Sequence, residues 1–308
     1  MKSPSHLLIL WSLILLTTSC STSTAPVTAP QQTPAVESLP SPKQVTPTQS
    51  TIKMKPSTPV PYTAAKSVCV IDAKTGNVIY EKNAHEKRAI ASVQKLMTAL
   101  VALDNVPLSQ SITVDSRDNQ IPGSQMNFEE GATYSLETLL YPLLIKSAND
   151  SAQIIARNVA GTPEAFVEKM SLKAKALGMN QTRFANPHGL TEPLDQQHST
   201  ARDVAKLAFV AQKNATIDRI IQTKTHTFKR KNGTTKSLTN TNQLLKTRTD
   251  CQGMKTGYTK AAGRCLVSKA SHEGKSIIVV CLGSGDLWNT PNQVWTDSNR
   301  LLDHFLYQ

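Results

Sequence analysis

The order of hydrophobic patterns along the chain is the feature that most constrains its fold. Two strand-like runs, 67–72 and 77–81, come before a long middle region, and three more, 252–257, 265–270 and 276–283, follow it. A short turn joins the first two runs, which predicts a hairpin. Strands at both ends of a helical region commonly join in one antiparallel sheet with the helices packed beside it. The sequence therefore predicts an α+β domain built around a five-stranded antiparallel sheet.

The middle region and the end of the chain show apolar residues at helical spacing. Ser135 begins one such segment, and Ser199 or Thr200 can cap another. A hairpin over 228–237 is expected around the Asn232-Gly233 pair. The expected helices cover residues 96–103, 135–144, 150–160, 163–177, 200–211 and 293–306, and a short strand covers 111–114.

The first residues have the layout of an export signal. Lys2 provides a positive start, residues 7–16 an apolar core and residues 17–19 a zone of small side chains. The apolar core is too short to span a bilayer as a mature helix. We therefore expect residues 1–19 to be a signal peptide and the mature protein to be exported to the periplasm or cell envelope.

Cys20 directly follows the small residues, as in the signals of bacterial lipoproteins. We expect this cysteine to become a lipidated N-terminus that anchors the protein to a membrane. Ordinary cleavage near Ser19 stays an alternative, because Thr17 stands where such signals usually carry leucine. Residues 20–62 are rich in Pro, Ser and Thr, which predicts an extended linker between the anchor and a catalytic domain over 63–308.

A formal net charge of +12 indicates anionic surroundings, such as lipid head groups, acidic polymers or a carboxylate substrate. Nucleic acid is not an expected partner, because no basic run is interleaved with aromatic residues, which make up 5% of the chain. Besides Cys20 there are four cysteines, Cys69, Cys251, Cys265 and Cys281. In an exported domain they can form disulfides in three pairings, or they can be buried as small apolar side chains. None has the spacing of a zinc site, so no metal is expected.

Ser92 and Lys95 form the first candidate catalytic pair. Residues three apart on a helix share a face, so the Ser92 hydroxyl and the Lys95 amine are expected to be neighbours. A serine hydroxyl needs a nearby base to become a nucleophile. A lysine amine can be that base only when it is neutral, which requires burial or a second cation close by.

Two further polar sites complete the candidate set. Ser147 and Asn149 lie where one expected helix ends and the next begins, a place where side chains can project into a cleft. Lys255, Thr256 and Gly257 lie near the end of an expected strand. A lysine there can hold an anionic group, a threonine can donate a hydrogen bond to it, and glycine allows close approach of a substrate backbone.

These three sites, in this order, resemble the signature of penicillin-binding proteins and class A β-lactamases. Within that group the chain resembles the D-alanyl-D-alanine carboxypeptidases of peptidase family S11. The resemblance extends from about residue 67 to the end of the chain. It includes the segments 126–131, 144–150, 184–190 and 253–259. It implies a β-lactamase/transpeptidase-like fold and a reaction that uses no cofactor.

The resemblance also implies a role for each residue. Ser92 attacks the bond between the two terminal D-alanines of a peptidoglycan stem peptide, Lys95 takes its proton, and Ser147 relays a proton to the leaving D-alanine. Asn149 holds the substrate amide or orients Lys95. Lys255 and Thr256 are expected to bind the substrate carboxylate, and Gly257 to lie beside the substrate backbone. The backbone amides of Ser92 and Tyr258 are expected to form the oxyanion hole. β-Lactam antibiotics acylate Ser92 and inhibit the enzyme.

Some features depart from the family. Many relatives carry an arginine for the carboxylate shortly before the last helix, whereas residues 291–297 contain none. Arg264 is a candidate substitute, and His188 is expected to be structural. Two other functions stay open: a serine β-lactamase, although the segment starting at Glu192 lacks the Glu-x-x-Leu-Asn pattern of class A enzymes, and a catalytically idle penicillin-binding or wall-scaffold lipoprotein.

Overall fold

The computed structural model describes residues 58–286 and 288–308. The expected signal peptide, Cys20 and the linker up to residue 57 lie outside the described residues. Within the described part, no helix has both the length and the apolar character needed to cross a membrane.

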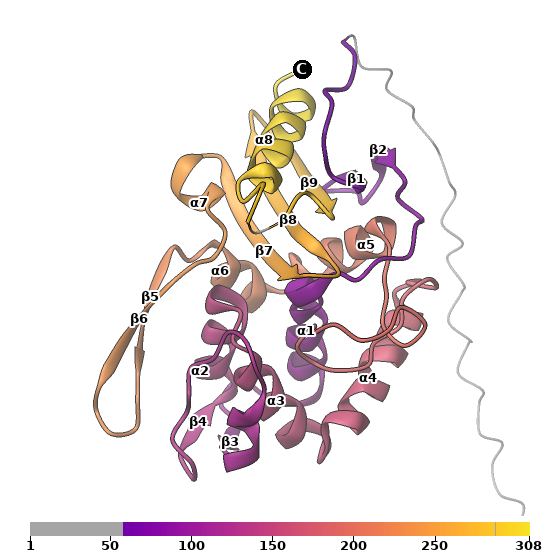
Figure 1. Ribbon diagram of the computed structural model, residues 1–308. Coiled ribbons are helices and arrows are strands. Elements are labelled where there is room, and N and C mark those ends of the chain that lie inside the picture. Colours follow the sequence, from indigo (N-terminus) through magenta and orange to yellow (C-terminus); the bar gives the residue numbers. More distant parts are fainter. Residues whose placement is uncertain (1–57, 287) are drawn as a thin grey trace, which may run out of the picture. The chain divides into compact units, whose positions relative to one another are not determined.

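The central feature of the fold is one antiparallel sheet of five strands in the order β2-β1-β9-β8-β7 (Figure 1). The strands are β1 (Ser67–Asp72), β2 (Val78–Lys82), β7 (Cys251–Thr259), β8 (Gly263–His272) and β9 (Lys275–Leu282). The N-terminal hairpin joins the C-terminal strands because β1 pairs along its whole length with β9. This arrangement confirms the predicted fold class, and it leaves β7 at one edge of the sheet.

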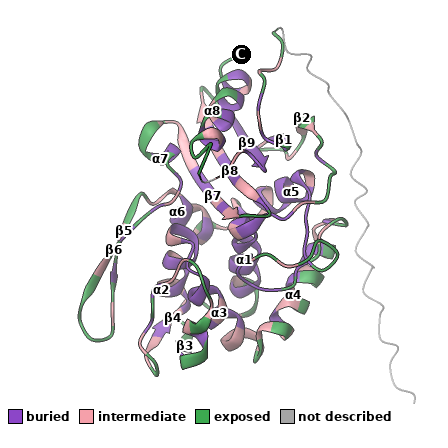
Figure 2. Cartoon of the chain, viewed as in Figure 1, coloured by how far each residue is buried: buried purple, intermediate pink, exposed green. Residues whose placement is uncertain are grey.

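Helices cover both faces of this sheet. Helix α8 (Gln293–Leu306) packs on one face against β8 and β9, whereas α5 (Ala201–Ala211) packs on the other against β1 and β9. The strand residues alternate accordingly, since Leu266 belongs to the core beneath α8 and Val267 to the larger core on the other side. Strand β9 is buried over nearly its whole length, as a strand covered on both faces must be (Figure 2).

The helical region beside the sheet is built around α1 (Lys95–Asn105), whose first eight residues are buried. Figure 2 shows α1 in purple, the colour of buried residues, among its neighbouring helices. The other elements of this region are η2 (Ser116–Gln120), α2 (Leu136–Tyr141), η3 (Pro142–Lys146), α3 (Asn149–Ala160), α4 (Pro163–Ala176), α6 (Ala215–Gln222), the strand pair β3 (Ser111–Thr113) and β4 (Thr133–Ser135), and the hairpin of β5 (Thr225–Lys229) and β6 (Thr235–Thr239). The short helix α7 (Leu244–Thr247) packs against β7 instead.

The element boundaries show where local sequence signals fail. The helix expected to begin at Ser135 is observed, with the Ser135 side chain as its N-cap, but it changes at Pro142 to a π-helical turn that ends at Lys146. Proline lacks the backbone N–H that an α-helix needs at this position, which explains the change.

Helix α6, helix α7 and strand β4 were not predicted. α7 and β4 are too short to show a pattern of their own. Helix α6 does carry a local signal that the prediction missed, with Ile217, Ile220 and Ile221 at helical spacing after the capping Asn214.

The cysteines resolve the alternative left open by the sequence. Cys69, Cys265 and Cys281 are buried, Cys251 is half-buried, and all four thiols are free in the described structure. Burial raises the pKa of Cys265 to about 11 and that of Cys281 to about 12. These thiols are therefore protonated at neutral pH and pack as small apolar groups.

Candidate active site

Ser92 lies in a short 3-10 turn, η1 (Ala91–Gln94), directly before α1 rather than within it. Two glycines allow other segments to pack closely on this turn. A Cβ atom on Gly257 would lie 2.9 Å from the Ile90 carbonyl oxygen and 3.0 Å from the Ser92 nitrogen. Gly189 has a φ of +87°, and a Cβ there would lie 2.3 Å from the Ala91 carbonyl oxygen. Strand β7 can therefore run directly alongside the backbone of Ser92.

The Lys95 amine lies among three oxygen atoms. Its Nζ is 2.8 Å from the Ser92 Oγ, 2.7 Å from the Asn149 Oδ1 and 2.6 Å from the carbonyl oxygen of His188. Lys95 is completely buried. None of these three partners is a carboxylate, so the amine has no direct counterion to keep it charged.

The electrostatics of the site favour a neutral Lys95. Burial lowers the pKa of Lys95 well below its ordinary value, the positive charge of Lys255 lowers it further, and the negative charge of Asp150 acts in the opposite direction. Burial also lowers the pKa of Lys255, to about 7. The requirement for a lysine base, burial together with a second cation, is thus met by these two residues.

Asn149 and Ser147 come from the segment that joins η3 to α3. The Asn149 side chain is held at both ends, because its Nδ2 donates to the Pro122 carbonyl oxygen at 2.6 Å while its Oδ1 faces Lys95. Ser147 has left-handed backbone geometry, with a φ of 64°, which turns the chain between the two helices. Its buried hydroxyl has no hydrogen-bond partner among the described residues, so it is free to bond to a ligand.

Lys255, Thr256, Gly257 and Tyr258 all lie on the edge strand β7. The buried Lys255 amine donates to the Thr256 carbonyl oxygen at 3.0 Å. The Thr256 hydroxyl lies 2.6 Å from that of Thr241, and the Thr241 amide donates to the Ile145 carbonyl oxygen just before Ser147. The outer edge of β7 faces the turn that holds Ser92, and an extended peptide can pair with such an edge.

Arg264 lies on β8 directly opposite Tyr258, and Leu266 lies opposite Thr256. Residues opposite each other in an antiparallel pair share a face, so Arg264 is on the same face of the sheet as Thr256. The Arg264 Nε is buried and has no hydrogen-bond partner in the described structure. No carboxylate of the described residues pairs with this guanidinium, which lies on the face of the sheet that Thr256 and Tyr258 share.

His188 contributes its backbone to the site rather than its ring. Its carbonyl oxygen contacts Lys95, whereas its Nδ1 accepts a hydrogen bond from the Leu190 amide at 3.3 Å. Burial and the charge of Lys95 lower the pKa of His188 to about 3, so the ring is neutral. The sequence did not predict the contact of the His188 carbonyl oxygen with Lys95 or that of the Thr241 hydroxyl with Thr256. A backbone oxygen is present at every residue, and nothing in the sequence around Thr241 indicates a role in the site.

The sequence of this chain matches a known protein family. Residues 53–285 match the model of the peptidase S11 family, described as D-alanyl-D-alanine carboxypeptidase. The chain is 34% identical over 244 residues to the D-alanyl-D-alanine carboxypeptidase DacF of Bacillus subtilis, covering 78% of this chain but only 61% of that protein. It is 35% identical over 226 residues to the D-alanyl-D-alanine endopeptidase of Escherichia coli, covering 72% of each.

Solved structures with the same fold include the DD-transpeptidase of Streptomyces K15. It has a TM-score of 0.74 and 28% sequence identity, and the match covers 80% of this chain and 98% of that one. A D-alanyl-D-alanine carboxypeptidase of Mycobacterium tuberculosis has a TM-score of 0.72 and 28% identity, with 80% and 96% covered. These similarities confirm the β-lactamase/transpeptidase-like architecture predicted from the sequence.

Proposed function

This chain belongs to the peptidase S11 family of D-alanyl-D-alanine carboxypeptidases, and from that membership we propose that it is a serine-type D-Ala-D-Ala carboxypeptidase. Its proposed substrate is a peptidoglycan stem peptide, from which it removes the terminal D-alanine. The observation that carries the proposal is the buried Lys95 amine, 2.8 Å from the Ser92 Oγ and close enough to the Lys255 cation for that charge to lower its pKa.

In the proposed acylation step, the neutral Lys95 amine accepts the Ser92 proton while the Ser92 Oγ bonds to the substrate carbonyl carbon. The backbone amides of Ser92 and Tyr258 stabilise the resulting oxyanion, and one such donor is typically worth about 100- to 1000-fold in rate. When the C–N bond breaks, the leaving D-alanine nitrogen takes up a proton. The unpartnered Ser147 hydroxyl relays that proton from Lys95, which returns to its neutral form.

The terminal carboxylate of the substrate is proposed to bind between Lys255, Thr256 and Arg264. Lys255 and Arg264 supply positive charge, and the Thr256 hydroxyl supplies a hydrogen bond. Asn149, whose amide is fixed by Pro122, keeps Lys95 in position and contacts the substrate amide. The substrate backbone is proposed to lie along the free edge of β7. The expected contact of Gly257 with that backbone is not what the structure shows, because the space beside Gly257 is taken by the turn that holds Ser92.

Deacylation completes the proposed cycle. A water molecule gives a proton to Lys95 while its oxygen attacks the ester carbonyl carbon. The bond between that carbon and the Ser92 Oγ then breaks, Lys95 returns the proton to the Oγ, and the shortened peptide leaves with a new carboxyl group. A β-lactam has the same reactive amide and carboxylate, so it is proposed to acylate Ser92 and to leave slowly. A β-lactamase needs a second base for fast deacylation, and among the described residues no carboxylate or imidazole ring hydrogen-bonds to Ser92 or Lys95.

Release of D-alanine from a synthetic peptide ending in D-alanyl-D-alanine tests the proposal directly. The full chain should release D-alanine, and Ser92→Ala should abolish both this release and labelling by a fluorescent penicillin. Labelling without D-alanine release would instead support an idle penicillin-binding protein. Rapid and repeated hydrolysis of penicillin would support a β-lactamase.

We also propose that the protein is exported to the cell envelope and anchored by lipid at Cys20. The support is the sequence of residues 1–20, with a positive start, an apolar core and small residues before the cysteine. Cells expressing the full chain should incorporate a labelled fatty acid into the protein, and Cys20→Ala should remove the label. Secretion of an unlabelled wild-type protein would contradict the anchor while leaving export intact.

A further inference from the structure

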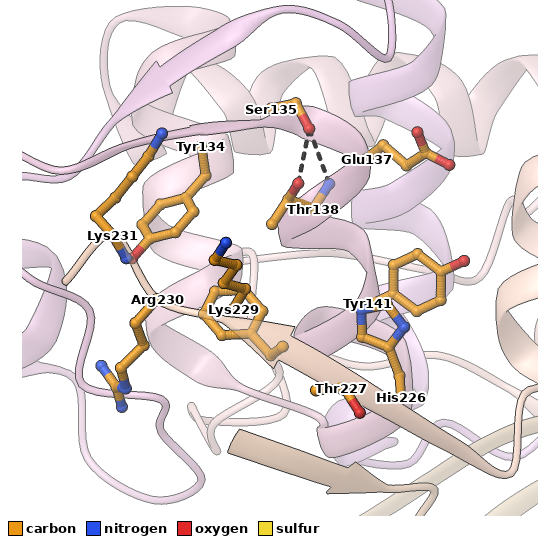
Figure 3. A pocket seen from close by; sticks show the side chains of 11 residues that line it. Tyr134, Ser135, Glu137, Thr138, Tyr141, His226, Thr227, Lys229, Arg230 and Lys231 are labelled. Carbon is orange, nitrogen blue, oxygen red and sulfur yellow. Dashed lines mark hydrogen bonds between the residues drawn. The ribbon is translucent and has the colours of Figure 1, made fainter. Parts of the chain in front are cut away.

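A cavity of about 600 Å³ lies between the β4–α2 segment and strand β5, and none of the proposed catalytic or substrate-binding residues line it (Figure 3). Its walls are aromatic and rigidly packed. Phe228 is buried, with its ring centroid 5.5 Å from that of Tyr134, and Tyr141 stacks on His226 with centroids 3.7 Å apart. Because these rings support one another, the cavity is formed without a ligand.

The cavity carries unneutralised positive charge. Lys229 and Lys231 line it, are exposed, and form no ion pair within the described structure. The acidic lining residue, Glu137, is already paired with Arg219 at 2.7 Å. Figure 3 shows the two lysines gathered beside Tyr134, whereas Glu137 lies on the other side, near Tyr141. The hydroxyls of Ser135 and Thr138 add polar groups to the wall.

The wider hairpin has the same charge. Residues 224–239 contain Lys224, Lys229, Arg230, Lys231 and Lys236 but no acidic residue. Such a concentration of cations around an aromatic and hydroxyl-lined cavity favours a ligand that carries carboxylates and other polar groups.

The wall helix α2 leads to the active site, and so does β6, the strand that pairs with the wall strand β5. Helix α2 continues through η3 to Ser147, and β6 continues to Thr241, whose hydroxyl contacts that of Thr256. Arg230 also donates hydrogen bonds to the carbonyl oxygens of Met126 and Asn127, at 2.6 and 2.7 Å.

Met126 and Asn127 also connect the cavity to Lys95, the proposed base. Their amides donate to the Asp150 carboxylate at 2.7 and 2.8 Å, and Asp150 directly follows Asn149, which contacts Lys95. The cavity and the proposed base are thus joined by a chain of contacts within the protein.

We propose that this cavity is a second binding site for the peptidoglycan polymer, which holds a carboxylate-bearing segment other than the D-alanyl terminus being cut. The identity of the polymer rests on the proposed function, whereas the charge and shape of the site do not. Lys229 and Lys231 bind the carboxylates, and the aromatic walls contact the apolar parts of the segment. None of the proposed substrate-binding residues line the cavity, so it is expected to affect the polymeric substrate and not a short peptide held by those residues.

Kinetics on two substrates test this site. The substrates are a synthetic tripeptide ending in D-alanyl-D-alanine and soluble, uncross-linked glycan strands that carry pentapeptides. The variant Lys229→Gln/Lys231→Gln should raise KM for the glycan strands about 3- to 10-fold, the range for two exposed charge pairs, and leave the tripeptide kinetics unchanged. The matched control Lys224→Gln/Lys236→Gln removes the same charge from hairpin residues outside the cavity. It should leave the tripeptide kinetics unchanged and raise KM for the glycan strands less than the cavity variant does.

Equal effects on both substrates, no effect on the strands, or an equal effect of the control variant would each overturn the proposal. Sedimentation with the glycan strands, using the full chain with Ser92→Ala, separates this site from the proposed reaction because it needs no turnover. In the Ser92→Ala background, Lys229→Gln/Lys231→Gln should bind the strands more weakly than the control Lys224→Gln/Lys236→Gln. Amidating the polymer carboxylates should weaken strand binding more in the protein that keeps Lys229 and Lys231 than in the variant that lacks them. Equal weakening in both would contradict a carboxylate ligand.

Discussion

Lysines occur in this molecule in two contrasting settings, the active-site groove and the cavity beside the β5–β6 hairpin. In the groove, Lys95 and Lys255 are buried, and burial is the largest cause of the fall in both pKa values. In the hairpin, Lys229 and Lys231 are exposed to solvent. The same side chain is thus prepared as a base in one region and as a cation for an anionic polymer in the other.

The comparison teaches that solvent exposure decides which chemistry a lysine can perform. A buried amine responds strongly to one neighbouring charge, because the low-dielectric surroundings do not screen it. An exposed amine contributes only a small attraction, which salt reduces. Changes in the groove should therefore have large effects that do not depend on salt, and changes in the hairpin small effects that do.

Replacing the proposed base should have the largest effect. Lys95→Arg keeps a positive charge but cannot become neutral, so it should lower the rate of acylation by a fluorescent penicillin about 1000-fold or more. Stopped-flow labelling measures this rate, and circular dichroism checks that the variant is folded. A variant that kept a tenth of the wild-type rate would show that a neutral amine at this position is not required.

Removing the second cation should shift the pH dependence of the reaction. The charge of Lys255 lowers the pKa of Lys95, so Lys255→Met should raise that pKa and move the acidic limb of kcat/KM to higher pH. At neutral pH the loss should be about 100-fold, because a buried charge partner of the substrate is also removed.

Lys255→Arg provides the control for that experiment, since it keeps the charge. Its acidic limb should stay near the wild-type position even if the rate falls. Identical limbs in the wild type, the methionine variant and the arginine variant would mean that burial alone sets the protonation of Lys95, and that the two amines act independently.

The Arg264 guanidinium should matter less, because Lys255 and Thr256 are proposed to share the same carboxylate. Arg264→Gln should raise KM for the synthetic tripeptide about 10-fold, the cost of one charge-assisted hydrogen bond, with little change in kcat. A tripeptide amidated at its C-terminus should be bound equally by the wild type and the variant. If KM for the tripeptide with a free C-terminal carboxylate did not change, Lys255 and Thr256 alone would bind that carboxylate.

Much of the fold was predictable because its signals are local. The strand pairs at both ends of the chain have their own turns, and α8 (Gln293–Leu306) matches the residues predicted from its apolar spacing. The spacing of Ser92 and Lys95 predicted that they would be neighbours, and the 2.8 Å contact agrees. The 3-10 turn that holds Ser92 was not predicted, because it depends on the packing of Gly189 and Gly257 from distant segments.

The missing parts of the site are those that depend on tertiary contacts. The His188 carbonyl oxygen and the Thr241 hydroxyl reach the site from distant points of the chain, and a backbone oxygen leaves no mark in the residue type. The position of Arg264 opposite Tyr258 follows from strand register, which local patterns fix only in part. The sequence could name the reactive groups but not the contacts that adjust their pKa values.

The smallest effect concerns salt, and it tests the comparison most directly. Raising the ionic strength from about 0.1 M to 1 M shortens the screening length from about 10 Å to 3 Å. In the wild type this should raise KM for glycan strands by about the same factor as Lys229→Gln/Lys231→Gln, whereas in that variant salt should have little further effect. The tripeptide kinetics should change less, because Lys255 is buried and poorly screened. An equal salt response of both substrates would mean that the groove and the hairpin bind anions in the same way, and the proposed division between them would be wrong.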